Sequence, residues 1–200
     1  MTIGLGGVLQ AMQHEQQEEQ VLLKRIARGD EDALRWLVDV YGQRLYAYAL
    51  RLTGDPIAAD EAVQESLVAV WQGGAGRYRG EGSLAAWLLR IVHHKALNGL
   101  RGRPVESLDA GIIETAADGP LPDDLALHAD QHRLLRDGLS ALSTDHRAVL
   151  ELVFYQGLSL EEAARVLDCP LGTVKSRLSY AKNALRGALG RAGLTVEDVR

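Results

Sequence analysis

Hydrophobic residues in the first half of the chain recur at steps of three and four positions, which is the spacing of an amphipathic α-helix. A first stripe runs from residue 34 to residue 52, and Gly54, Asp55 and Pro56 are expected to end that helix. A second stripe follows and predicts a second helix. The inward-facing residues are expected to be Leu34, Leu37, Val38, Tyr41, Leu45, Tyr48 and Leu52 in the first helix and Ala59, Val63, Leu67 and Val70 in the second.

A glycine-rich segment at residues 73–82, GGAGRYRGEG, predicts a loop after the second helix. Ser83 is a suitable N-cap residue, so a third helix is expected from there to about Leu100. No segment shows the sustained alternation of a β-strand, and no internal repeat is present. The sequence therefore predicts an all-α fold.

Residues 157–186 carry the most specific local pattern, a short helix, a tight turn and a second helix, which is the plan of a helix-turn-helix DNA reader. Ser159 and Glu162 have capping-box spacing and predict the start of the first helix. Pro170 suits the first turn of the second helix, and Gly172 is expected to give backbone freedom at the turn. The contacts that fix the helix crossing are expected from Ala163, Ala164, Leu167 and Val174.

Charge is distributed unevenly along a chain whose net charge is −5. The chain is therefore not a generally basic nucleic-acid coat, and any DNA contact must come from local patches. Residues 170–191 carry five cations and no acid, and residues 77–103 carry six Lys or Arg against Glu81 alone. Residues 104–124, in contrast, carry six acids and no Lys or Arg.

The same acidic segment contains three of the five prolines, which is typical of a flexible linker. The N-terminal segment lacks the apolar mass to bury itself and is expected to be a frayed tail or a solvated helical extension. The chain is thus interpreted as two small helical domains on an acidic tether. The expected divisions are an N-terminal tail at 1–20, a first domain at 21–103, the linker at 104–127, a helix-turn-helix domain at 128–192 and a C-terminal tail at 193–200.

The third predicted helix carries a stripe of an aromatic ring, cations and amide or imidazole donors at steps of three and four residues. Such a stripe suits a nucleic-acid strand, whose bases stack on rings and whose phosphates bind cations. The alternative is a core tryptophan beside a solvated face. The stripe is Trp87, Arg90, His94, Asn98 and Arg101, with Lys95 beside it, and Arg77, Tyr78 and Arg79 in the preceding loop add to it.

Signals for other chemistry are weak. The single cysteine, Cys169, excludes an internal disulfide and suits a reducing cytoplasm; it is interpreted as a packing residue, with a redox switch as the minor alternative. His128 and His132 have a zinc-compatible spacing but no evident third ligand, so neither a metal nor a cofactor is expected. No basic leader, membrane span or catalytic constellation is found, and we expect no enzyme. His93 and His94 are interpreted as hydrogen-bond donors on a DNA-facing helix.

The order of these segments resembles bacterial RNA polymerase sigma factors of the extracytoplasmic-function class. The resemblance spans roughly residues 20 to 190 and rests on DEAVQESLVAVW, then YRGEGSLAAWLLRIVHHKALN, an acidic linker and LSTDHRAVLELVFYQGLSLEEAARVLDCPLGTVKSRLSYAKNAL. It implies a promoter-specificity subunit with a sigma-2 domain that melts the −10 element and a sigma-4 domain that reads the −35 element. It also implies core polymerase, promoter DNA and an anti-sigma factor as partners of a monomeric, cytoplasmic protein.

The resemblance gives each patch a role. Glu61, Gln64 and Glu65 would contact the polymerase clamp helices, although a solvated acidic face would look the same in the sequence. The loop RYRGEGS would capture a flipped-out base, and the stripe of the third helix would line the same strand. The basic helix from Thr173 onward would enter the major groove of the −35 element. The residues nearest base edges would be Lys175, Ser176, Ser179 and Tyr180, and those on phosphates or core polymerase would be Arg177, Lys182 and Arg186.

Three positions depart from the family pattern, so base preference is not transferred. His94 stands where Asn is common, Asn98 near a common Asp, and Tyr180 where Arg is frequent. Two other functions stay open: a stand-alone helix-turn-helix regulator, and a protein that only binds polymerase or an anti-sigma factor. A stand-alone regulator requires only one basic DNA-binding patch, and a protein that binds only other proteins requires none. Basic patches in both domains therefore favour a sigma factor.

Overall fold

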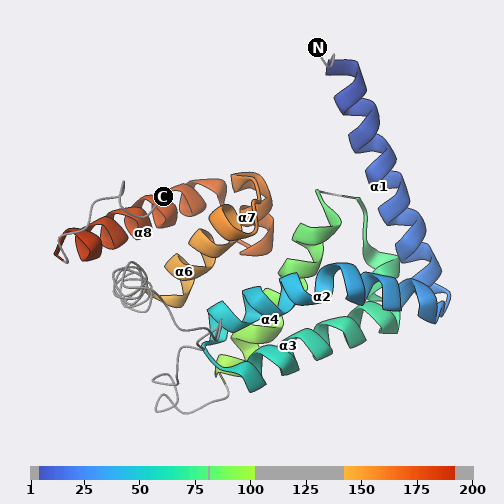
Figure 1. Ribbon diagram of the computed structural model, residues 1–200, viewed down its shortest axis with the longest axis horizontal. Coiled ribbons are helices and arrows are strands. Elements are labelled where there is room, and N and C mark those ends of the chain that lie inside the picture. The colour runs from blue at the N-terminus through green and yellow to red at the C-terminus, as the bar shows by residue number, and fades with distance from the viewer. Residues whose placement is uncertain (1–4, 81, 102–141, 192–200) are drawn as a thin grey trace, which may run out of the picture. The chain divides into compact units, whose positions relative to one another are not determined.

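The computed structural model describes residues 5–80, 82–101 and 142–191, and every regular element in those ranges is helical (Figure 1). The chain divides into two compact units, Met1–Gly111 and Ile112–Arg200. The expected all-α fold with two domains is therefore confirmed. The expected linker at 104–127 lies outside the described residues, and each unit is considered by itself.

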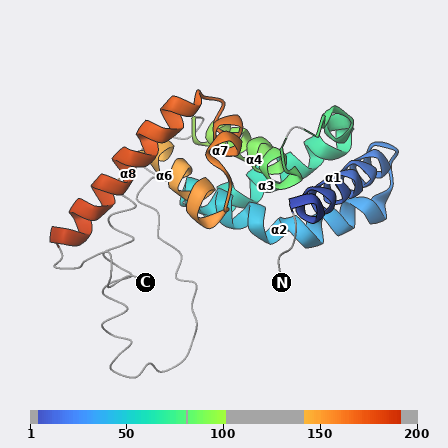
Figure 2. The same ribbon diagram turned by 90° about the horizontal axis from the view of Figure 1, so that it is seen from above.

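The first unit is a bundle in which α2, α3 and α4 pack against one another (Figure 1 and Figure 2). The α1 helix meets α2 at the turn between them and also contacts the two short helical turns that follow α3. The elements are α1 (Leu5–Ala27), α2 (Glu31–Thr53), α3 (Pro56–Ala69), the π-helical turn η1 (Val70–Gly74), the 3-10 turn η2 (Ala75–Arg77) and α4 (Leu84–Arg101).

Local capping residues define where α2 and α3 begin and end. Asp30 accepts a hydrogen bond from the Ala33 N–H at 3.1 Å and so caps the start of α2. Gly54 ends it with a left-handed φ of 69°, a conformation that glycine adopts without steric cost. Asp55 then caps α3 and Pro56 occupies its first turn. The helix break predicted from these residues is confirmed.

The predicted stripe of α2 forms much of the core, with one error. Leu37, Leu45, Tyr48 and Leu52 are buried, and Leu34 and Tyr41 are partly buried. Val38 was expected inside but is 37% exposed, because the neighbouring helices cover a narrower face than the hydrophobic pattern suggests. In the next stripe Ala59, Val63 and Val70 are buried, whereas Leu67 is only partly buried.

The expected N-terminal extension is helical and takes part in the first unit. The α1 helix continues through position 20, where the tail was expected to end, and buries Leu23 and Ile26. The Glu19 carboxylate accepts hydrogen bonds from the Leu84 N–H at 3.2 Å and from the Tyr78 hydroxyl at 3.3 Å. Glu19 therefore helps Ser83 to cap the start of α4, a role that the sequence did not reveal.

The second unit contains a helix-turn-helix in which α8 packs on α6 and α7 (Figure 1). The capping box is confirmed: the Ser159 N–H donates to Glu162 Oε2 at 3.0 Å, and the Glu162 N–H donates to Ser159 Oγ at 3.2 Å. Ala163 and Val174 are fully buried at the crossing, with Ala164 and Leu167 partly buried. The elements are α6 (Thr144–Leu150), the π-helical turn η4 (Glu151–Tyr155), α7 (Leu160–Val166) and α8 (Leu171–Arg191).

The turn between α7 and α8 uses a different residue from the one expected. Gly172 lies inside the first turn of α8 and has no positive φ. Asp168 instead adopts the left-handed conformation, with a φ of 50°. Aspartate tolerates this conformation better than most non-glycine residues. The carbonyl of Pro170 accepts the first helical hydrogen bonds of α8, from Thr173 and Val174.

Candidate polymerase and nucleic-acid interfaces

The outer face of α3 combines polar and apolar side chains. Glu61, Gln64 and Glu65 are exposed, as expected for residues opposite the buried stripe. Ile57 and Val68 lie on the same face at helical spacing and are 65% and 50% exposed. Apolar side chains on a mainly polar face can supply the buried part of a docking contact. The sequence pattern did not single out these two residues, because they lie outside both the inward stripe and the polar motif.

Two rings meet at the start of α4. The centroids of Tyr78 and Trp87 lie 5.4 Å apart with their planes inclined at 59°. The Tyr78 hydroxyl shares its one proton between the Gly82 carbonyl at 2.9 Å and the more distant Glu19 carboxylate at 3.3 Å. Both aromatic residues are half-buried, so Trp87 is neither a core residue nor a free ring. Arg77 and Arg79 on either side of Tyr78 are exposed. The loop thus holds a fixed aromatic pair between two solvent-facing cations.

The α4 helix exposes part of the predicted stripe. Arg90, His94 and Asn98 are exposed along one side, while the Lys95 ammonium is paired with Glu65 of α3 at 3.0 Å. His93 does not share the outer face as expected. It is 3% exposed, and its Nδ1 lies 2.8 Å from the Tyr48 hydroxyl, in a buried hydrogen bond. The orientation of the Arg101 side chain lies outside the described part of the chain.

The α8 helix presents a polar outer face opposite its buried residues Val174 and Ala181. Lys182 lies over the Phe154 ring, with its ammonium 5.1 Å from the ring centroid. Asn183, which the charge pattern does not single out, accepts a hydrogen bond from Arg186 at 3.1 Å. Most of the predicted −35 residues are exposed, namely Lys175, Ser176, Ser179, Tyr180, Lys182 and Arg186, and Thr173 is partly buried.

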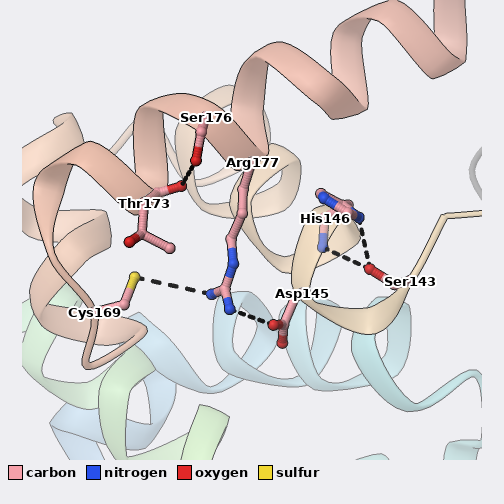
Figure 3. A network of polar contacts seen from close by, with 7 residues as sticks. All are labelled: Ser143, Asp145, His146, Cys169, Thr173, Ser176 and Arg177. Atoms are coloured by element: carbon pink, nitrogen blue, oxygen red, sulfur yellow. Dashed lines mark hydrogen bonds and ion pairs between the residues drawn. The ribbon is translucent and has the colours of Figure 1, made fainter.

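Arg177 differs from the other cations of α8. It was expected to contact a phosphate or core polymerase, but its guanidinium pairs with the Asp145 carboxylate at the start of α6 (Figure 3). The same guanidinium lies 3.9 Å from the Cys169 sulfur in the turn before α8. Arg177 therefore ties three segments of the second unit together. Cys169 is partly buried in this contact, as expected of a packing residue.

Tyr180 also contacts α6. Its ring stacks on the His146 imidazole, with centroids 4.4 Å apart and planes inclined at 25°. Ser143 Oγ lies 2.7 Å from Nδ1 of the same imidazole (Figure 3). The start of α6 thus holds two residues of α8, through the ring stack and through the Arg177 ion pair.

Among the described residues, the pKa values of Asp30 and Arg147 are shifted by their surroundings. The hydrogen bond from Arg25, at 2.8 Å, and the α2 cap lower the pKa of Asp30. Burial lowers the pKa of the Arg147 guanidinium, and the charge of Glu151 opposes this shift. Within residues 5–80, 82–101 and 142–191, no group of three His, Cys, Asp or Glu side chains is placed to hold a metal. His128 and His132 lie outside these ranges.

A helix that spans a membrane needs about 20 consecutive, predominantly apolar residues. None of the helices in the described ranges is both long and apolar enough to cross a bilayer.

The two units match two consecutive family models. Residues 37–104 match Sigma-70 region 2, and residues 138–187 match Sigma-70 region 4. An ECF RNA polymerase sigma factor, SigL, of Mycobacterium tuberculosis is 33% identical over 175 residues, which cover 84% of this chain and 96% of the relative. The RNA polymerase sigma-H factor of Pseudomonas aeruginosa is 33% identical over 189 residues, which cover 87% and 95% respectively.

Solved structures with a similar fold are complexes. CnrH bound to the cytosolic domain of CnrY superposes with a TM-score of 0.63 and 25% identity, covering 86% of this chain and 97% of CnrH. The sigma factor RpoE bound to the anti-sigma factor NepR, from Bartonella quintana, gives a TM-score of 0.59 and 28% identity over 78% of this chain and 96% of RpoE.

Proposed function

The chain belongs to the sigma-70 family, in its extracytoplasmic-function class, and is a promoter-specificity subunit of bacterial RNA polymerase; we propose that its two units divide the −10 and −35 elements between them. The observation that carries this proposal is the match of each compact unit to one sigma region, in the family order. Each unit also presents its own cationic surface, as a protein that contacts two separated promoter elements requires.

Docking to core polymerase is assigned to the outer face of α3. Glu61, Gln64 and Glu65 supply polar contacts to the clamp helices, and Ile57 and Val68 supply apolar contacts at the two ends of the face. Ion pairs between exposed charged side chains contribute little binding free energy, whereas burial of apolar side chains contributes more. Ile57 and Val68 therefore favour a docking role for this face over a merely solvated acidic face.

The −10 element is assigned to the η2–α4 region. Extracting a base from the duplex costs a few kcal/mol, and a site for that base must return stacking and hydrogen bonds. The Tyr78–Trp87 pair provides a pre-formed aromatic surface. Phosphates of the same strand are assigned to Arg77, Arg79, Arg90, Lys95 and Arg101, and hydrogen bonds to the strand are assigned to His94 and Asn98.

The −35 element is assigned to the outer face of α8, which enters the major groove. Lys175, Ser176 and Ser179 lie on its early turns and are assigned to base edges. Lys182 and Arg186 lie further along the helix and are assigned to phosphates. Arg177 is assigned a structural role, because Asp145 and Cys169 already engage its guanidinium.

We assign the regulation of this protein to an anti-sigma factor that covers the surfaces binding core polymerase and DNA. The solved relatives CnrH and RpoE are bound to CnrY and to the anti-sigma factor NepR, which supports this assignment. The acidic segment 104–124 is assigned to the path toward the polymerase active centre, where its carboxylates resemble the charge of nascent RNA. The free protein is taken as a monomer that works beside the chromosome in the cytoplasm, without catalytic chemistry of its own.

Binding to promoter DNA with and without core polymerase tests this assignment. A specificity subunit places its holoenzyme on a promoter at a salt concentration where the free chain binds duplex DNA weakly. A stand-alone regulator would instead bind its specific duplex without core enzyme. A protein that only holds polymerase would bind core and confer no promoter preference.

A further inference from the structure

The contact between His146 and Tyr180 joins the recognition helix to a residue outside the helix-turn-helix. His146 belongs to α6, whereas Tyr180 belongs to α8, and their rings are stacked at 4.4 Å. We propose that His146 is a specificity-determining residue that acts by positioning Tyr180 against one base pair of the −35 element. This inference rests on the proposed entry of α8 into the major groove.

Tyr180 lies at the border of the groove-facing side of α8. Successive residues of an α-helix are about 100° apart, so Tyr180 is about one quarter-turn from the fully buried Ala181. Its side chain is 60% exposed, and an exposed tyrosine ring ordinarily samples several rotamers. A ring in that place reaches a base edge only in some of those rotamers. Tyr180 therefore contributes to specificity only if a neighbour restricts it.

His146 is held in the orientation that restricts the ring. Ser143 Oγ accepts the His146 N–H at 3.4 Å as the N-cap of α6, and the same oxygen lies 2.7 Å from the imidazole Nδ1, within hydrogen-bond distance. This hydrogen bond fixes the plane of the imidazole, whichever of the two atoms donates it. One face of the Tyr180 ring is then covered by a side chain that is itself anchored.

The neighbouring ion pair keeps the two helices in register. Arg177 and Tyr180 are three residues apart on α8, and Asp145 and His146 are consecutive on α6. The Arg177–Asp145 pair and the ring stack therefore form two adjacent links between the same two helices (Figure 3). With the ring fixed by these links, the phenol hydroxyl offers a single donor and acceptor to a base edge, and the ring edge suits a thymine methyl group.

The test measures base preference at every position of the −35 element for the holoenzyme. Competition binding with singly substituted promoters compares the parent with His146→Ala, His146→Phe and Tyr180→Ala. Tyr180→Ala is expected to remove the preference at one position. His146→Ala should reduce that same preference by about two- to tenfold, the range expected for loss of an aromatic pair. His146→Phe should retain more of it than His146→Ala, because a phenyl ring preserves the stack although it loses the Ser143 hydrogen bond.

Two results would overturn the inference. The first is an unchanged base preference in His146→Ala at the position that depends on Tyr180. The second is an equal loss of that preference in His146→Phe and His146→Ala, which would mean that the Ser143 hydrogen bond matters and the ring stack does not. Lys175→Ala is the matched control and should change a different position. If the parent holoenzyme shows no preference anywhere in the −35 element, the proposed function of α8 itself fails, and this inference with it.

Discussion

The Lys95 ammonium lies 3.0 Å from the Glu65 carboxylate, so a residue of the proposed −10 surface is paired with a residue of the proposed polymerase-docking surface. Their side chains are 36% and 62% exposed. An exposed pair of this kind contributes only about 0.2–1 kcal/mol, so a binding partner can separate it. Docking of Glu65 on polymerase would release Lys95 for DNA, and the two events are therefore expected to assist each other.

Glu65→Gln tests this relationship in the free protein. Removal of the carboxylate should raise the affinity for a single-stranded −10 oligonucleotide by up to about fivefold, because Lys95 is no longer paired. Fluorescence anisotropy at low salt measures the affinity. Glu61→Gln removes the same charge from the same face without touching Lys95 and serves as the control. An equal gain in both variants would mean that only the net charge matters.

The apolar ends of the α3 face give a second prediction. Ile57→Ser and Val68→Ser should weaken binding to core polymerase while leaving helix content unchanged, because both side chains are largely exposed in the free protein. Replacement of Glu61, Gln64 and Glu65 by alanine should act in the same direction. Val63→Ser, at a buried position of the same helix, is expected to lower the unfolding temperature instead. If the protein still binds core polymerase as tightly after all these substitutions of exposed residues, the docking assignment is wrong.

The cations of α8 are expected to separate by role. Arg186→Ala should weaken binding to all DNA sequences alike. It should also reduce the slope of log affinity against log salt concentration by about one unit, as loss of one phosphate contact does. Lys175→Ala should reduce the binding free energy for the best −35 sequence by about 1–3 kcal/mol and remove the base preference at one position. Arg177→Ala should leave the slope unchanged and lower thermal stability. A reduced slope for Arg177→Ala would contradict its structural assignment.

Features set by neighbouring residues were predictable from the sequence. The break at Gly54, Asp55 and Pro56 and the Ser159–Glu162 capping box depend on residues within three positions of each other, so their geometry follows directly from residue type. The exposure of the α3 face opposite its buried stripe was predictable for the same reason.

Features set by partners distant in the chain were not predictable. His93 is buried against Tyr48, its hydrogen-bond partner, which lies 45 residues earlier in the chain. Its position next to His94 in the sequence gave no sign of this contact. Arg177 is engaged by Asp145, 32 residues earlier, so its charge gave a false indication of a phosphate contact. The spacing of hydrophobic residues in the sequence predicts a helix and its apolar side. Which further side chains a neighbouring helix buries depends on the tertiary packing.

The cap of α2 predicts a pH dependence of stability. A carboxyl group whose pKa is lower in the folded chain stabilises the fold above its unfolded-state pKa, and this contribution is lost as the pH falls through the folded-state value. Asp30→Asn keeps a capping acceptor but removes the charge that Arg25 binds. Its unfolding temperature should lie below that of the parent near neutral pH and approach it in acid.

Asp30→Ala is the comparison variant for this measurement. It removes the capping acceptor as well as the charge, so it should stay less stable than the parent across the whole pH range. A constant difference between Asp30→Asn and the parent from neutral to strongly acidic pH would show that the charge of Asp30 does not contribute.

The most direct test of the whole account is run-off transcription with purified core polymerase and a promoter library. We expect the chain to direct core enzyme to start transcription from a subset of templates that share defined −35 and −10 elements, and core enzyme alone to show no such selection. Transcripts that are the same with and without the chain, despite demonstrated binding to core polymerase, would contradict its assignment as a promoter-specificity subunit.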